Sequence, residues 1–214
     1  SRRHPDPTGF HTHTVLKYLK KHMHHATEGP YNLDDAGVFW DFASLPQDQP
    51  DGMPMTDAEK VDFQRGLRAI NLLFGDPKTV VLQLTKVPER WHFANLPDSE
   101  VNLTPYRNRG WCFYETTVSS TLKSSHLLLD LGLGEKELES ESADWQEVQA
   151  ASSGIRRPPL TPEDMALELK QRKFAKKCDA ELVAQRYTEF FHEATASART
   201  LNLSNCRRGT GWCA

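Results

Sequence analysis

The 214-residue sequence lacks the features typical of membrane-spanning and nucleic-acid-binding proteins. Its longest apolar run, Leu127 to Leu133, is interrupted by Asp130 and is far too short to cross a bilayer. The net charge is −3, so no global basic field would attract nucleic acid or an anionic membrane. We therefore expect neither a nucleic-acid partner nor a membrane partner.

Cysteine is scarce and its spacing excludes the common zinc motifs. The four cysteines are Cys112, Cys178, Cys206 and Cys213. They form no CxxC pair, so neither a zinc cage nor a disulfide framework is expected, and a reducing, cytoplasmic compartment is the simplest interpretation. His22 and His25, three residues apart on a predicted helix, are spaced to share a metal ion. A polar, partly cationic helix face is the favoured interpretation, because no cysteine or carboxylate lies nearby, and we expect no metal.

A signal-peptide pattern and an initiating methionine are also missing, so we expect the sequence to be an excerpt of a longer protein. Periodic and apolar segments alternate along it. Helices are predicted over about 10–25, 57–75 and 111–123, and strands over 38–45, 79–84 and 126–131. Thr56 and Glu59 have the spacing of a capping box at the second helix. This order predicts a parallel α/β sheet.

The composition divides the chain into four parts. They are an α/β domain at 1–135, a linker at 136–159 with a short helix around Trp145 and Val148 as an alternative, a helical extension at 160–200 and a tail at 201–214. Thr161 and Pro162 begin the extension as N-cap and first helical residue. The tail sequence LNLSNC resembles the core of a leucine-rich repeat, and a single repeat cannot bury its own face. We therefore expect the tail to be at most the start of a repeat array.

The segment Tyr106 to Lys123 (YRNRGWCFYETTVSSTLK) stands out because a carboxylate falls on its apolar stripe. The residues at i, i+4, i+7 and i+11 are Trp111, Glu115, Val118 and Leu122. The opposite side is polar but uncharged, so we expect this helix not to be freely solvated. A carboxylate held against apolar surface is costly unless it is paired or used. Pairing of Glu115 with Arg107 or Arg109, catalysis, and another ligand contact are the alternatives.

Several motifs together resemble a TIR (Toll/interleukin-1 receptor) domain. VFWDFASLPQ, a helix, TVVLQLT, a long loop and GWCFYE are similar to its central and C-terminal part, over about residues 10–135. The likeness is to a divergent group with WD-x-x-SLPQ and RGWC-x-x-E motifs. It implies a flavodoxin-like sheet, with Asp41 at the end of the second strand and Trp111-Cys112-x-x-Glu115 on the αC helix.

The resemblance implies two functions of different classes. In enzymatic TIR domains the glutamate of this box, here Glu115, hydrolyses NAD at the nicotinamide–ribose bond, which develops oxocarbenium character. Trp111 would then form part of the wall, and Asp41 and Ser44 would bind substrate at the carboxyl ends of the strands. NAD would be a substrate, and no cofactor is implied. In adaptor TIR domains the module signals by homotypic self-association. A nucleoside-transferring relative is a third possibility.

One departure from the TIR pattern affects the fold. The first strand of a flavodoxin-like sheet lies centrally, and nothing before Phe10 has the pattern of a strand. We therefore predict a TIR/flavodoxin-like parallel sheet with flanking helices that lacks its first strand, followed by a C-terminal helical extension.

Overall fold

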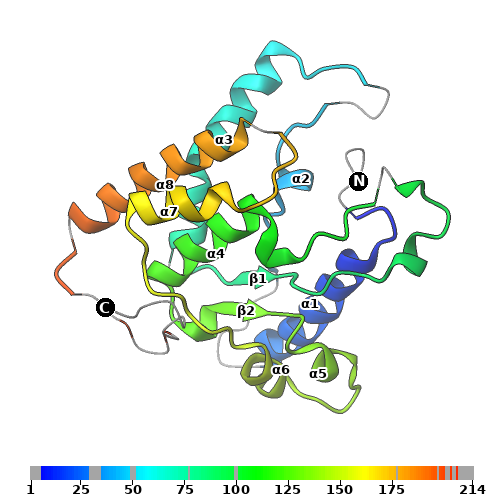
Figure 1. The fold of residues 1–214 in the computed structure, drawn as a ribbon. Helices are drawn as coiled ribbons and strands as arrows, with labels where there is room; N and C mark the ends of the chain where they lie inside the picture. The colour runs from blue at the N-terminus through cyan, green and yellow to red at the C-terminus, as the bar shows by residue number, and fades with distance from the viewer. Residues whose placement is uncertain are drawn as a thin grey trace.

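A two-stranded parallel sheet lies between two groups of helices in the computed structural model, which describes residues 6–28, 35–48, 52–76, 78–98, 101–176, 178–196, 198–200, 203 and 206 (Figure 1). The strands are β1 (Val81–Gln83) and β2 (Leu128–Asp130). The helices are α1 (Phe10–Glu28), α2 (Asp41–Ser44), α3 (Asp57–Gly75), α4 (Gly110–Leu122), α5 (Glu135–Glu139), α6 (Trp145–Ser152), α7 (Pro162–Lys170) and α8 (Asp179–Ala196). Short 3₁₀ turns cover Arg90–Phe93, Tyr106–Asn108 and Ser125–Leu127.

The sheet pairs the two predicted strands directly. Val81 is opposite Leu128 and Gln83 is opposite Asp130, in parallel register. On the other edge of β2, the backbone N–H of Gly154 donates to the carbonyl of Leu128 at 2.9 Å, and Ser153 forms an antiparallel bridge with Leu129. The predicted parallel α/β character is therefore confirmed. Within the described residues the sheet is much smaller than a complete flavodoxin-like sheet.

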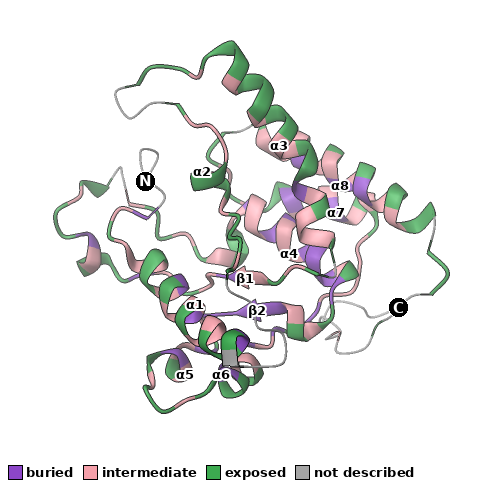
Figure 2. Ribbon diagram, turned by 180° about the vertical axis from the view of Figure 1, so that it is seen from behind, coloured by how far each residue is buried: buried purple, intermediate pink, exposed green. Residues whose placement is uncertain are grey.

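Each face of the sheet is covered by its own apolar cluster (Figure 2). On one face, Tyr18 of α1 packs with Leu129 and with residues of α5 and α6. On the other face α4 packs against α7 and α8. The buried members of this second cluster are Phe113, Tyr114, Val118, Met165, Leu169, Val183, Tyr187 and Phe190. Helix α8, the second helix of the extension, contributes Val183, Tyr187 and Phe190 to this cluster.

Helix α4 is buried on more sides than its apolar stripe predicts. Leu122 of the stripe is 46% exposed, whereas Thr117, Ser119 and Ser120 are buried. The stripe predicts that Leu122 faces the core and does not predict burial of the three hydroxyl residues, so it is wrong here. The reason is that the sheet covers one side of α4 while α7 and α8 cover another. The hydroxyl of Thr117 tolerates burial because it donates to the carbonyl of Phe113 at 2.8 Å. The expectation that the helix is not freely solvated is confirmed.

The predicted strand over 38–45 is wrong. Residues 36–40 belong to no helix or strand, and α2 follows at Asp41. Val38 and Phe39 are 49% and 39% exposed, so they do not form a buried strand. Local polar groups favour the turn, since Asp41 Oδ1 accepts from the N–H of Phe42 at 2.7 Å and Ser44 Oγ accepts from the N–H of Trp40 at 3.0 Å.

The segment predicted as a linker, 136–159, carries α6 and most of α5, both of which join the core. Leu138, Trp145 and Val148 are buried in the cluster formed with α1 and β2. Lys21 of α1 donates to the carbonyl of Ala143 at 2.6 Å and so holds the turn between the two helices. The repeat-like tail sequence lies outside the described residues apart from residues 203 and 206. No helix in the described part of the chain is both long and apolar enough to span a bilayer.

Replacing the N-cap of α6 is expected to destabilise the fold measurably. Asp144 accepts from the N–H of Glu147 at 2.8 Å, and Glu147 accepts from the N–H of Asp144 at 2.9 Å, which is a capping box. Asp144→Ala should lower the free energy of unfolding by about 1 kcal/mol, measured by urea unfolding. Asp144→Asn retains a capping oxygen and should stay close to wild type. Equal losses in both variants would argue against the cap.

Candidate functional site

Glu115 lies in the second turn of α4, partly buried and without a counter-ion. It forms no hydrogen bond or ion pair with the residues that the structure describes. Burial, and then the carboxylate of Asp41, raise the pKa of Glu115 to about 8. The guanidinium of Arg109 bonds instead to the carbonyl of Thr104 at 2.8 Å. The structure therefore does not show the pairing of Glu115 with Arg107 or Arg109 that the sequence left open.

Asp41 and Glu115 are brought together although 74 residues separate them in the chain. Asp41 begins α2, and its charge raises the pKa of both Glu115 and Cys112. Burial is the largest cause for the Cys112 thiol, followed by the carboxylate of Glu115, and the pKa of this thiol rises to about 12. A thiol with so high a pKa stays protonated at neutral pH and is not a nucleophile. The carboxylates of Glu115 and Asp41, and not the Cys112 thiol, are therefore the candidate reactive groups here.

The other two predicted substrate contacts are engaged elsewhere. Trp111 Nε1 donates to Asp179 Oδ2 at 3.3 Å, and the indole packs against the cluster between α4, α7 and α8. Ser44 Oγ accepts the N–H of Trp40 inside α2. In this structure Trp111 thus connects α4 with the beginning of α8, and Ser44 stabilises a turn. Glu115 and Asp41 are the predicted site residues that lie close to one another.

A cavity lies beside α4 at the carboxyl ends of β1 and β2, where open α/β sheets bind ligands. Gln83 Nε2 donates to Thr116 Oγ1 at 2.9 Å across it. Cys112 and Thr116, on the same helix as Glu115, line the cavity, and Glu115 itself does not. We call it the arginine cavity. Its lining residues are Gln83, Thr85, Tyr106, Arg107, Cys112, Phe113, Thr116, Asp130, Leu133, Gly154, Ile155 and Arg157.

Arginines of this cavity were not among the site residues predicted from the sequence. Arg157 Cζ lies 5.2 Å from the centroid of the Phe113 ring, and Arg172 Cζ lies 4.3 Å from it. Arg107 comes from the 3₁₀ turn that precedes α4. The pattern RRPP at 156–159 is the available sequence signal, but it stands in a stretch that composition assigns to a linker.

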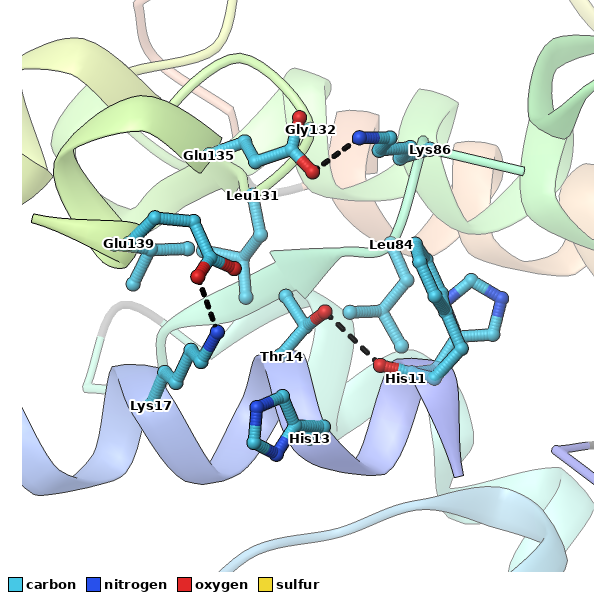
Figure 3. A pocket seen from close by; sticks show the side chains of 12 residues that line it. His11, His13, Thr14, Lys17, Leu84, Lys86, Leu131, Gly132, Glu135 and Glu139 are labelled. Carbon is cyan, nitrogen blue, oxygen red and sulfur yellow. Dashed lines mark hydrogen bonds and ion pairs between the residues drawn. The ribbon is translucent and has the colours of Figure 1, made fainter. Parts of the chain in front are cut away.

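A second cavity lies on the opposite side of the sheet, between α1 and α5 (Figure 3). Its apolar floor is formed by Leu84, Leu131 and neighbouring residues. Two ion pairs bracket it, between Lys17 and Glu139 and between Lys86 and Glu135. Each cation at this cavity thus has its own carboxylate, and the lysines and glutamates leave no net charge.

The two histidines with metal-like spacing pack against an aromatic ring. The rings of His22 and Trp145 have centroids 4.8 Å apart, and His22 also stacks on Tyr18 with centroids 5.7 Å apart. The ring of His25 stacks on Trp145 with centroids 6.3 Å apart. No group of three or more potential ligands gathers in the part of the chain that the structure describes.

Among the described residues, the carboxylate pair and the arginine cavity both hold charged groups without an ion-pair partner. Comparisons of the chain with protein-family models, with curated proteins and with solved structures found no match.

Proposed function

We propose that the chain is a TIR-like signalling module that hydrolyses NAD at the nicotinamide–ribose bond, with Glu115 as the catalytic carboxylate. The observation that carries the proposal is the position of Glu115, partly buried beside Asp41 and unpaired among the described residues. Two neighbouring carboxylates without a cation disfavour ionisation of one of them, an arrangement that recurs at functional sites.

A positively charged ligand would resolve this electrostatic conflict. The nicotinamide ring of NAD is cationic, and the positive charge moves onto the ribose as the glycosidic bond breaks. A cation between Glu115 and Asp41 would favour the ionised form of Glu115, because the attraction grows as the carboxyl group loses its proton. The site would then bind most strongly the state in which charge develops on the ribose.

The reaction needs little from the protein beyond this stabilisation. The bond between the ribose C1 and the nicotinamide nitrogen breaks, and nicotinamide leaves as a neutral molecule with the bonding electron pair. Water adds to C1 and releases one proton, giving ADP-ribose. An ionised Glu115 stabilises the oxocarbenium-like transition state and can accept the proton of the attacking water.

The arrangement of the elements supports a TIR-like module, and the burial of α4 argues against association through this helix. The parallel pair β1 and β2, with α4 between them in the chain, matches the order of adjacent strands in a flavodoxin-like sheet. Leu122 is the only exposed residue of α4, so this helix offers little surface for homotypic association. We therefore favour hydrolysis over the alternative of a non-catalytic TIR-type interaction module.

Nicotinamide release from NAD tests the proposal. The purified protein should release nicotinamide, measured by chromatography, and Glu115→Gln should lower the rate at least about 100-fold, because the variant removes the charge that stabilises the transition state. The matched control is Glu193→Gln, which changes an exposed carboxylate of α8. No turnover by the protein, or equal turnover by the Glu115→Gln variant, would refute the proposal.

A further inference from the structure

The arginine cavity gathers positive charge that the rest of the structure does not balance. Arg107 and Arg157 line it, and neither forms a hydrogen bond or ion pair with the described residues. Arg172, which also contacts the Phe113 ring, has one counter-ion, Glu168, four residues earlier. The guanidinium groups of Arg157 and Arg172 therefore both contact the ring of Phe113, and that of Arg107 lines the same cavity.

The electrostatic cost of this arrangement is visible at Arg157. Burial lowers the pKa of Arg157, and the neighbouring charges of Arg107 and Arg172 lower it further, while Glu168 offsets only part of this effect. Arg172 also has a buried Nε without a hydrogen-bond partner among the described residues. Guanidinium groups held close together and incompletely hydrogen-bonded are destabilising unless an anion joins them.

The one carboxylate that lines the cavity is already occupied by its own turn. Asp130 Oδ1 accepts from the hydroxyl of Thr85, from the N–H of Gly132 at 3.0 Å and from the N–H of Leu133 at 3.2 Å. These donors hold it at the end of β2, and no arginine pairs with it. Asp130 therefore does not provide the missing counter-ion for Arg107 and Arg157.

The cavity on the opposite face of the sheet provides a comparison within the same molecule. There Lys17 and Lys86 each have a glutamate partner (Figure 3). Both cavities lie near the carboxyl ends of the same strands, so position at the sheet edge alone does not leave cations unpaired. Of these two cavities, only the arginine cavity has arginine or lysine side chains without an ion-pair partner among the described residues.

We propose that the arginine cavity binds the phosphate group of a small phosphate monoester, held by Arg107 and Arg157. Planar guanidinium groups match the geometry of phosphate oxygens and bind them with charge-assisted hydrogen bonds. The hydroxyl pair of Tyr106 and Thr116 lies at the same cavity, and Leu133 and Ile155 add apolar surface for the organic part of the ligand.

The proposed site connects two parts of the chain. Arg107 precedes α4, whereas Arg157 and Arg172 come from the segments before and after α7. A phosphate bound to both sides would stabilise the contact between the α/β part and the helical extension. The site does not depend on Glu115, which lies outside the cavity lining. Phosphate binding can therefore be tested independently of NAD hydrolysis.

Calorimetric titration with AMP, adenosine and inorganic phosphate tests this proposal on the whole protein. AMP should bind at least about tenfold more tightly than adenosine, because only AMP offers charge-assisted hydrogen bonds to the arginines. Inorganic phosphate should compete with AMP. Equal affinities for AMP and adenosine, or no competition by phosphate, would overturn the proposal.

Three variants locate the binding. Arg107→Gln, on the exposed side of the cavity, and Arg157→Gln should each weaken AMP binding at least about tenfold. Arg68→Gln removes an exposed arginine of α3 and should leave the affinity unchanged. Glu115→Gln should also retain it, which separates this result from the NAD assay. An Arg107→Gln affinity equal to that of Arg68→Gln would refute the site even if Arg157→Gln fails to fold.

Discussion

Replacing Tyr187 with alanine is expected to lower the free energy of unfolding by about 4 kcal/mol. Tyr187 is fully buried at the centre of the cluster that joins α8 to α4 and α7. Its ring centroid lies 6.5 Å from that of Tyr114 and 5.8 Å from that of Phe190. Removing the ring leaves a cavity between three helices that the surrounding backbone can close only in part.

The hydroxyl of Tyr187 provides the matched control. It donates to the carbonyl of Leu160 at 2.9 Å and accepts from the N–H of Leu160 at 3.2 Å. Tyr187→Phe keeps the ring and removes both bonds, so it should cost about 1–2 kcal/mol. Urea unfolding followed by circular dichroism measures both variants. If Tyr187→Ala costs no more than Tyr187→Phe, the ring does not hold the extension to the domain.

The parts of the fold that follow from local chemistry could be predicted from the sequence. The spacing of Val183, Tyr187 and Phe190 fixes the inner face of α8. The β-branched and leucine-rich runs at 79–84 and 126–131 contain both strands. The capping box of Thr56 and Glu59 begins α3 at the predicted place. In each case the residues that predict the element lie close together in the sequence.

The parts that depend on contacts far apart in the chain could not be predicted in this way. The run at 38–45 has strand-like composition, but a helical turn begins at Asp41, and among the described residues no strand pairs with this segment. The acidic stretch that contains α5 and α6 becomes structural only because α1 covers Leu138 and Trp145. No periodicity indicates burial of α4 on several sides.

The candidate site shows the same difference between local signals and long-range contacts. Glu115 was found from its position on an apolar stripe and from a family-like box, both local signals. The arginine cavity was not, because Arg107 and Arg157 are fifty residues apart and meet only after α4 has packed against the extension. An acidic residue spaced to pair with these arginines would have indicated the site in the sequence. The counter-ion that we propose is a bound phosphate, which leaves no such signal.

The stability of the protein is expected to depend on pH through Glu115. The folded state holds the proton of Glu115 up to a pKa of about 8, whereas the unfolded chain releases it near the model-peptide value of 4.5. Between these values the folded state binds more protons than the unfolded state. The contribution of Glu115 to stability is therefore fully present below about pH 4.5 and is lost as the pH rises through 8.

The size of this effect follows from linkage. Relative to a Glu115→Gln variant, which has no proton to release, the free energy of unfolding should fall by up to about 1.4 kcal/mol per pH unit between pH 5 and 8. Urea unfolding of both proteins at several pH values measures the difference. Parallel stability curves for the two proteins would mean that Glu115 is ionised in the folded state and that its burial is less costly than the geometry indicates.

The same titration governs the proposed catalysis, since a protonated Glu115 cannot stabilise an oxocarbenium ion. In the free enzyme the rate of NAD hydrolysis at low NAD concentration should therefore rise with pH up to about 8. Asp41→Asn removes the neighbouring charge that helps to raise this pKa, so its profile should rise at lower pH. Glu193→Gln should leave the profile unchanged, because that carboxylate is exposed on α8. A profile that Asp41→Asn does not move would separate Asp41 from the reacting carboxylate and would leave burial as the only cause of the high pKa.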